Sequence, residues 1–175
     1  GLVASCGDAG RAAKANADVR QLSALGPDAA SAHAALPRWA LVGRSCHSAE
    51  QVDAAIAEDG VDFFTVSPVF NTAGVGGAGL TLVSHAARVA PPGDPASKPW
   101  FAVGGVNAEN LDRVLAAGAR RIGVTRAIVA RKNPQAAAAE LKERLRQAWN
   151  ADPAMEKVTL NAFTTPKPAP RPPRS

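Results

Sequence analysis

Short apolar runs rich in β-branched and aromatic residues recur along the chain, and glycine, proline or small polar residues bound each of them. Runs of this kind predict buried strands. Between them lie alanine-rich segments in which apolar residues such as Val52, Ala55 and Ile56 are spaced to share one helical face. The pattern therefore predicts strands that alternate with helices. The six candidate strands are residues 2–4, 19–22, 40–42, 63–66, 100–103 and 122–124.

Polar residues mark where several of the predicted helices begin. Ser48 is followed by Gln51 at the spacing of a capping box, and Asn133 precedes Pro134, which suits the first position of a helix. Asn107 likewise precedes a helical segment. Strands that alternate with helices predict an α/β fold with a parallel sheet. The spacing fits an open doubly wound sheet and a closed barrel equally, so both stay open at this point.

Composition and charge favour a single domain with a tail. At 175 residues, 46% hydrophobic and 20% charged, the chain fits one globular domain. We expect this domain over residues 1–150 and a C-terminal extension over residues 151–175, whose end is proline-rich and basic. The net charge of +5 gives little support for nucleic-acid binding, because Lys167, Arg171 and Arg174 supply three of those charges in the tail.

Export signals, paired cysteines and catalytic histidines are not evident in the sequence. It contains no run of about 18 or more apolar residues, and its first residues lack the pattern of a signal peptide. We therefore expect a soluble, cytoplasmic protein that does not enter a membrane. Cys6 and Cys46 lack a CxxC partner and the spacing of a zinc site, so we expect buried, reduced thiols. His47 and His85 have no paired carboxylate at a defined spacing, and we assign neither a catalytic role.

Three of the predicted strands end in loops rich in glycine or small polar residues: residues 67–77, 103–107 and 124–128. Glycine lets the backbone approach a ligand closely, and the first N–H groups of a following helix attract an anion. In barrels, the loops after the last two strands commonly hold a substrate phosphate. Together these loops predict a phosphate site, to which Arg126 would add a fixed positive charge.

Four segments carry a recognisable order of motifs. They are residues 43–48 (Gly-Arg-Ser-Cys-His-Ser), 67–72 (Ser-Pro-Val-Phe-Asn-Thr), 98–107 (Lys-Pro-Trp-Phe-Ala-Val-Gly-Gly-Val-Asn) and 117–128, which ends in Arg-Ala-Ile. In this order and spacing they resemble the thiamine phosphate synthase family, from about Trp39 to Trp149. Family members are TIM (β/α)8 barrels. The resemblance thus implies that the six strands are the third to the eighth, and that the first two βα units are absent from this chain, which begins at Gly1.

The resemblance also implies an activity. Family members are transferases that condense hydroxymethylpyrimidine diphosphate, an aminopyrimidine, with thiazole phosphate to give thiamine phosphate and pyrophosphate, with Mg²⁺ assisting the loss of pyrophosphate. Such catalysis is largely electrostatic, because donors and cations must lie where charge accumulates on the departing diphosphate. The expected partners are phosphorylated small molecules and, in a homo-oligomer, further copies of the chain.

Individual positions take their expected roles from the same resemblance. Ser45 would contact the diphosphate, and two further groups of residues would hold the thiazole phosphate and the metal ion. The phosphate would be bound by Thr72, Ala73, Gly74, Gly105, Thr125 and Arg126, and the metal by Asp8 and Asp28.

Several family positions are altered in this chain. Where the family has Thr-x-Thr-Lys, the sequence reads Thr72-Ala73-Gly74-Val75, so a hydroxyl and a lysine are missing. Where the family has Gln-x-Asp, residues 24–28 read Ala-Leu-Gly-Pro-Asp, and Asp28 could replace the metal-binding aspartate only with a shift of register. These departures predict a weak synthase or none.

Two other functions remain open at this level. The first is a thiazole tautomerase-like isomerase on the same barrel, although that enzyme expects a histidine where this chain has Ser67-Pro68. The second is a degenerate, non-catalytic homologue that keeps a phosphate pocket or acts through its proline-rich tail.

Overall fold

Six strands form one parallel sheet and lie side by side in the order in which they occur along the chain. The computed structural model describes residues 3–6, 12, 14–37, 39–71 and 76–164. The strands are β1 (Ala4–Cys6), β2 (Val19–Leu22), β3 (Leu41–Cys46), β4 (Phe63–Val66), β5 (Trp100–Val103) and β6 (Ile122–Gly123). The six strands predicted from the apolar runs are therefore confirmed, with β3 longer than expected and β1 shifted toward Cys6.

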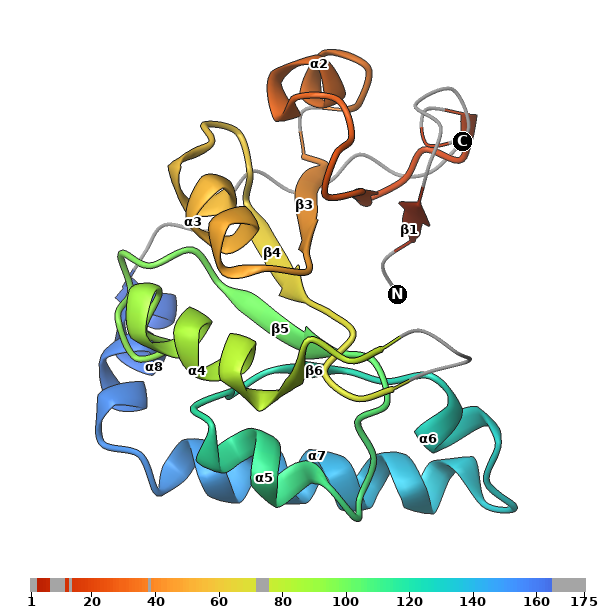
Figure 1. Ribbon diagram of the computed structural model, residues 1–175, viewed down its shortest axis with the longest axis vertical. Helices are drawn as coiled ribbons and strands as arrows, with labels where there is room; N and C mark the ends of the chain where they lie inside the picture. Colours follow the sequence, from red (N-terminus) through yellow and green to blue (C-terminus); the bar gives the residue numbers. More distant parts are fainter. Residues whose placement is uncertain (1–2, 7–11, 13, 38, 72–75, 165–175) are drawn as a thin grey trace.

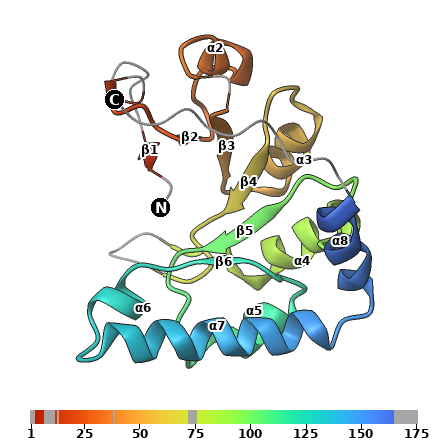
Figure 2. The same cartoon turned by 180° about the vertical axis from the view of Figure 1, so that it is seen from behind.

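Helices follow the strands along the chain and cover one side of the sheet (Figure 1). They are α2 (Ala29–Ala34), α3 (Ala49–Ala57), α4 (Gly79–Val89), α5 (Leu111–Ala116), α6 (Arg126–Val129), α7 (Pro134–Asn150) and α8 (Ala154–Thr164). Seen from behind, α7 runs beneath β6, with α6 near its start (Figure 2). A doubly wound sheet reverses its strand order at a switch point, whereas this sheet keeps a single order, as a barrel does. The α/β prediction is confirmed, and the sheet is a half-barrel of the TIM type.

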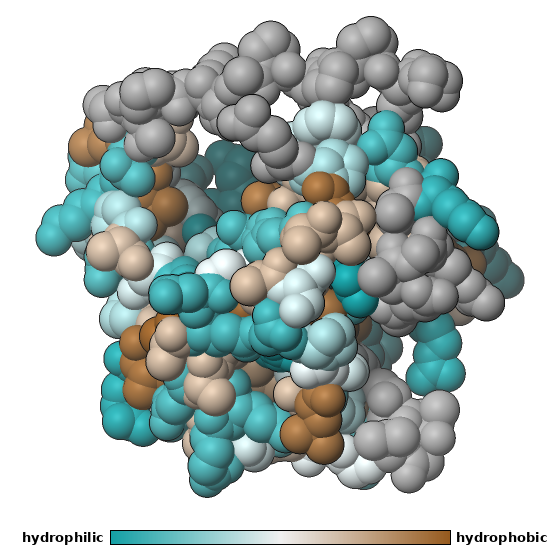
Figure 3. Space-filling view, turned by 90° about the horizontal axis from the view of Figure 1, so that it is seen from above, coloured by the Kyte–Doolittle hydropathy of each residue, from teal (hydrophilic) through white to brown (hydrophobic). Residues whose placement is uncertain are grey.

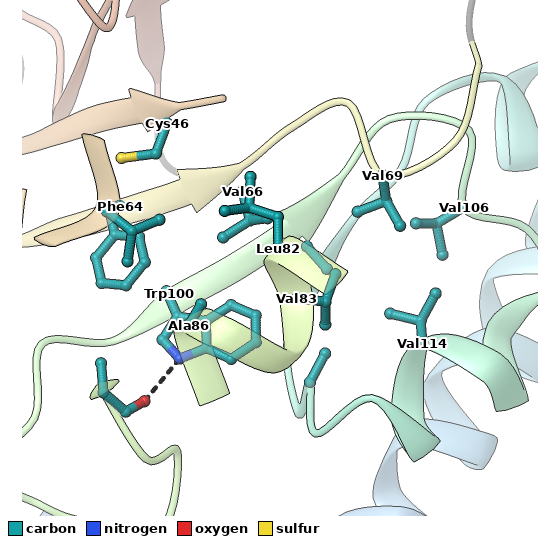
Figure 4. Close-up of a cluster of buried hydrophobic side chains, with 14 of the residues drawn as sticks. Cys46, Phe64, Val66, Val69, Leu82, Val83, Ala86, Trp100, Val106 and Val114 are labelled. Carbon is teal, nitrogen blue, oxygen red and sulfur yellow. Dashed lines mark hydrogen bonds between the residues drawn. The ribbon is translucent and has the colours of Figure 1, made fainter. Parts of the chain in front are cut away.

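The helix-covered side of the sheet is the outer face, and it carries the core. Phe64, Val66, Trp100 and Ala102 are buried there against α3, α4 and α5 (Figure 4). The rings of Phe64 and Trp100 stack with centroids 6.2 Å apart, and the Trp100 indole Nε1–H donates to the Ala90 carbonyl oxygen at 2.8 Å. Truncating a ring of this kind to alanine costs about 3–5 kcal/mol. The outer face therefore supplies the main stability of the half-barrel.

The opposite side of the sheet is the inner face, which we define by six residues whose side chains alternate with those of the core. All of them except the buried glycine are only partly buried. These residues are Gln21, Gly43, Ser45, Phe63, Thr65 and Phe101.

Two of the predicted helix caps are confirmed, and a third has a different role. The Ser48 hydroxyl accepts a hydrogen bond from the Gln51 N–H, and the Asn133 side chain accepts one from the Ala136 N–H at the start of α7. Asn107 does not cap a helix directly, because α5 begins at Leu111. Its side-chain oxygen instead accepts from two backbone N–H groups within the loop after β5.

The beginning of the predicted C-terminal extension is an ordered helix. Met155 in α8 is 1% exposed, and Asp152 just before it forms an ion pair with Arg120 at 2.8 Å. A Cβ on Gly93 would lie 2.5 Å from the Ala154 Cβ, so the turn at residues 91–95 packs directly against α8. The proline-rich tail from residue 165 onward lies outside the described residues.

Both cysteines are free, as the sequence predicts, but only one is buried. Cys46 lies in the core, where burial raises the pKa of its thiol to about 12. Cys6 is exposed, so the expectation that it is buried was wrong. It belongs to the first strand at one edge of the sheet, where only β2 pairs with it among the described strands.

Seen from above, hydrophobic residues lie in small separate groups among hydrophilic ones (Figure 3). Among the described helices, none is both long enough and apolar enough to span a bilayer.

Candidate functional site

A cavity of about 400 Å³ lies where β5 and β6 end. Its wall consists mainly of backbone and small side chains from the two loops that follow these strands, with arginine side chains at its edge. The lining residues used below are Gly104, Gly105, Thr125, Arg126 and Arg131. The cavity is thus built from two of the three loops in which the sequence predicts a phosphate site, those after β5 and β6.

The two glycines after β5 hold a backbone conformation that other residues rarely adopt. Gly104 has a φ of 95° and Gly105 a φ of 71°. A Cβ on Gly104 would lie 2.7 Å from the Pro68 Cα, and a Cβ on Gly105 would lie 2.8 Å from the Phe70 Cβ. The loop after β5 therefore needs glycine both for its conformation and for its close approach to the loop after β4.

Backbone hydrogen bonds join these two loops. The Val69 N–H donates to the Val103 carbonyl at 2.9 Å, and the Phe70 N–H donates to the Gly104 carbonyl at 3.1 Å. The loop after β4 is thereby held beside the cavity as far as Phe70. Its next three site positions, Thr72, Ala73 and Gly74, lie outside the described residues, so their predicted contacts with the phosphate stay predictions.

Side chains further along the loop fix its shape. The Asn110 amide donates to the Gly105 carbonyl oxygen at 3.0 Å, and its own side-chain oxygen accepts from the Asn107 N–H at 2.9 Å. These bonds hold residues 105–110 in one conformation. A preorganised loop needs little rearrangement to bind an anion.

The other wall carries the positive charge. Thr125 is the N-cap of α6, and none of the described side chains caps this helix. Its first N–H groups are therefore left by those side chains to water or a ligand. Arg126 opens α6, and Arg131 lies just beyond its end. Arg131 was missed in the sequence; its guanidinium lies 4.0 Å from the Glu109 carboxylate, a weak and exposed pair. The structure thus places Gly105, Thr125 and Arg126 around one cavity. That they bind a phosphate stays a prediction.

Ser45 lies elsewhere, on the inner face of β3. Its hydroxyl accepts a hydrogen bond from the Gln21 side-chain amide at 3.0 Å, and the same amide donates to the Thr65 hydroxyl at 3.3 Å. Gln21 and Thr65 were also missed in the sequence. The available signal was the occurrence of polar residues at inward-facing positions on three successive strands.

The predicted metal ligands do not form a site among the described residues. Asp28 is the N-cap of α2: one carboxylate oxygen accepts from the Ser31 N–H and the other from the Ser31 hydroxyl, both at 2.8 Å. Both hydrogen bonds lower the pKa of Asp28, and the one from the Ser31 backbone N–H has a larger effect than the one from the Ser31 hydroxyl. Asp8 lies outside the described residues, and those that are described include no group of three potential ligands suited to a metal ion.

One histidine has a partner that sequence spacing did not reveal. The His85 Nε2–H donates to the Asp53 carboxylate at 2.8 Å, and Arg88 donates to His85 Nδ1 at 2.9 Å. Asp53 lies 32 positions before His85 along the chain, so a search for carboxylates at a defined spacing does not find it. This group borders a groove between α3 and α4 that shares no lining residue with the cavity at the ends of β5 and β6.

Comparisons with known proteins identify what this chain is similar to. The family model described as thiamine monophosphate synthase matches residues 7–128. The thiamine-phosphate synthase of Thermobifida fusca is 47% identical over 133 residues, which cover 74% of this chain and 59% of that protein. That of Acidothermus cellulolyticus is 49% identical over 111 residues, covering 62% of this chain and 50% of the relative. This chain thus spans about half to three-fifths of the length of these curated relatives.

The fold agrees with a solved structure. The thiamine phosphate pyrophosphorylase from Pyrococcus furiosus superposes with a TM-score of 0.70 at 23% sequence identity, covering 84% of this chain and 68% of that one. At this identity the superposition supports the fold alone.

Proposed function

The chain belongs to the thiamine monophosphate synthase family, and on that premise we propose that it condenses hydroxymethylpyrimidine diphosphate with thiazole phosphate to give thiamine phosphate and pyrophosphate. The observation that carries the proposal is the cavity in which Gly105, Thr125 and Arg126 meet. It offers backbone N–H groups, a hydroxyl and a guanidinium to one anion, a combination suited to a phosphate monoester.

The cavity would act by holding the thiazole through its phosphate. A phosphate monoester carries nearly two negative charges at neutral pH. Arg126 and the uncapped start of α6 supply positive charge on one wall, while the fixed loop after β5 forms the other. Holding one reactant in this way converts part of a bimolecular encounter into an intramolecular step.

In this reaction the protein's main contribution would be to stabilise developing charge. The thiazole nitrogen attacks the methylene carbon of the pyrimidine with its lone pair, a C–N bond forms, and the C–O bond to the diphosphate breaks. The electron pair leaves with pyrophosphate, so no base has to remove a proton from the nucleophile. Donors near the departing oxygens stabilise the charge that accumulates there. The Ser45 hydroxyl on the inner face is the predicted donor.

Magnesium enters this proposal through the family alone. A bound Mg²⁺ would neutralise charge on the diphosphate. The described residues do not fit such an ion, because both Asp28 oxygens accept hydrogen bonds from Ser31 and no cluster of three potential ligands occurs among them. We therefore assign no step of the reaction to a metal bound by these residues, and Asp8 stays a predicted ligand only.

The proposal extends to architecture and setting. In it, the six strands correspond to the third to eighth strands of a (β/α)8 barrel, with residues 1–150 as the barrel part and 151–175 as an extension. The consecutive parallel strand order supports this correspondence. The substrates are phosphorylated small molecules, the setting is cytoplasmic, and assembly as a homo-oligomer is part of the same proposal. The isomerase and non-catalytic alternatives are not favoured, since the matching family and relatives are synthases.

Two measurements test the proposed function. The first is turnover: the chain is incubated with both substrates and magnesium, and thiamine phosphate and pyrophosphate are quantified. We expect both products in equal amounts, at a low rate. The second is thermal unfolding with and without thiazole phosphate. A ligand at about 100 times its Kd stabilises the native state by about 2.7 kcal/mol, so we expect a higher midpoint. Products absent and an unchanged midpoint would together reject the proposal.

A further inference from the structure

The Gln21 side chain joins three strands on the inner face. Its amide nitrogen donates to the Ser45 hydroxyl at 3.0 Å and to the Thr65 hydroxyl at 3.3 Å. Ser45 and Thr65 are directly paired across β3 and β4, and Gln21 in β2 is paired with Gly43. The amide therefore reaches across β3 toward β4. We call Gln21, Ser45 and Thr65 the inner-face fork.

Gly43 leaves the space in which this amide lies. A Cβ at Gly43 would be 2.4 Å from the Gln21 side-chain oxygen and 2.3 Å from the Phe63 Cζ, so any other residue would displace both side chains. Glycine inside a strand weakens it and often marks a close approach. Here the close approach is that of the inner-face fork and its aromatic neighbour Phe63, whose ring meets that of Phe101 edge-on at 5.8 Å.

The direction of these hydrogen bonds determines what the hydroxyls offer to a ligand. A side-chain amide nitrogen carries two protons, and in this arrangement it donates one to each of two hydroxyl oxygens in hydrogen bonds. Each hydroxyl keeps its own proton. Within the described part of the chain, no hydrogen bond donated by the Ser45 or Thr65 hydroxyl is recorded. Both residues lie on the inner face and are only partly buried.

We propose that Gln21 is a positioning residue that fixes the Ser45 and Thr65 hydroxyls as a pair of hydrogen-bond donors to the diphosphate of the pyrimidine substrate. This inference rests on the proposed function and deepens it: Thr65 becomes a second binding residue, and Gln21 acts through both hydroxyls. An O–H group that donates to an ionised oxygen makes one of the stronger hydrogen bonds in proteins. Two donors held in place cost no reorganisation when charge develops on the leaving group.

The test reverses the polarity of the inner-face fork without changing its shape. In Gln21→Glu, carboxylate oxygens would accept from both hydroxyls, whose lone pairs would then face the ligand. The probe is inorganic pyrophosphate, titrated calorimetrically into the full chain. We expect the wild-type chain to bind it and Gln21→Glu to bind at least about 10-fold more weakly, the scale of one lost charge-assisted bond. Thiazole phosphate should bind both proteins equally, because its cavity lies at the ends of β5 and β6.

Three further variants separate orientation from charge and folding. Gln135→Glu adds the same charge at an exposed position early in α7 and should leave pyrophosphate binding unchanged. Gln21→Leu removes the amide without adding charge and should weaken binding several-fold, because the hydroxyls lose their fixed direction. Thr65→Val keeps the shape of its side chain and removes one donor, so it should also weaken pyrophosphate binding. Circular dichroism verifies that each variant folds.

The outcomes distinguish this inference from the proposed function. Wild-type affinity for pyrophosphate in Gln21→Glu, Gln21→Leu and Thr65→Val would overturn the role of the inner-face fork, as would failure of the wild-type chain to bind pyrophosphate. Weaker pyrophosphate binding in these variants, with no thiamine phosphate formed by the wild-type chain and no change of its unfolding midpoint with thiazole phosphate, would support the fork and reject the proposed function. If the wild-type chain forms thiamine phosphate and Gln21→Glu, Gln21→Leu and Thr65→Val do so at the same rate, the proposed function is supported and the role of the inner-face fork is rejected.

Discussion

The loops that follow β5 and β2 use their polar groups in opposite ways. After β5, Gly104 and Gly105 bring the backbone to the edge of a cavity whose other wall begins at Arg126. After β2, the buried Arg44 side chain donates to the carbonyl oxygens of Ser23 and Pro27 at 3.1 and 3.0 Å. We propose that the loop after β5 leaves backbone groups to a ligand. The carbonyl oxygens of the loop after β2 instead accept hydrogen bonds from the protein's own Arg44.

The difference suggests which part of the proposed site this chain carries. The loop after β2 is where the family resemblance places a metal-binding aspartate, yet its only carboxylate, Asp28, caps α2. Leu25 in the same loop is 92% exposed and makes little contribution to the core. We accordingly expect the chain to bind a phosphate monoester well and to release pyrophosphate slowly, because that step is the one assisted by a metal ion. The four predictions below test this contrast.

The largest effect is expected from Arg44. Its guanidinium forms a bidentate pair with Glu58, and their side chains are 8% and 26% exposed. In Arg44→Met, Glu58 would lose its buried partner, which typically costs about 3–5 kcal/mol. We expect a loss of that order in urea unfolding, with unchanged affinity for thiazole phosphate in the folded fraction. Arg146→Ala, which breaks an exposed pair on α7, is the control and should change stability little.

The second effect concerns the cavity. Arg126→Ala removes a charge-assisted bond to the phosphate, worth about 1.5–3 kcal/mol, so thiazole phosphate should bind roughly 10- to 100-fold more weakly. Stability should scarcely change, because Arg126 is exposed. Arg126→Lys should restore part of the affinity. Calorimetric titration measures all three proteins, and equal affinities would place the phosphate elsewhere.

A smaller effect is expected from the pair at the rim of the cavity. Arg131 is 48% exposed and lies 4.0 Å from Glu109, which is itself 82% exposed. Arg131→Ala should weaken thiazole phosphate binding only a few-fold, because an exposed charge contributes little. Glu109→Ala should strengthen binding slightly, since it removes a competing anion. An unchanged affinity in Arg131→Ala would show that Arg131 does not contact the phosphate.

The smallest effect concerns Asp28 and pH. The hydrogen bonds from Ser31 lower the pKa of Asp28 below its ordinary value of 3.8. Its ionised form therefore stabilises α2 above that pH, and this contribution disappears as the pH falls through the lower folded value. Asp28→Asn keeps a capping oxygen but does not titrate, so its stability should depend less on pH between about 5 and 2. If Asp28→Asn instead abolished magnesium-dependent turnover, the aspartate would be a metal ligand.

Local patterns explain how much of the fold the sequence predicts. The strands were found because apolar runs end at glycine and proline, and the starts of α3 and α7 because Ser48 and Asn133 cap them over three residues. The choice between an open sheet and a barrel could not be made in this way. It depends on which strands pair, and pairing joins residues far apart in the chain.

The site likewise has parts with a local sequence signal and parts that depend on contacts between residues far apart in the chain. The glycine pair and Arg126 stand in short loops and could be recognised singly, and the family resemblance placed them together. The contact of Gln21 with Thr65 spans 44 positions and that of His85 with Asp53 spans 32. Neither has a local signature, because only the folded sheet and its packed helices bring these residues together. The exposure of Cys6 was missed for a similar reason, since its strand lies at a sheet edge.

The central claim is that the loops after β5 and β6 close around one phosphate. A crystal structure of this chain with thiazole phosphate tests it most directly. We expect the phosphate in the cavity between Gly105 and Arg126, within hydrogen-bonding distance of the first N–H groups of α6. A phosphate bound outside this cavity, with the loops unchanged and Arg126 making no contact to it, would contradict the claim.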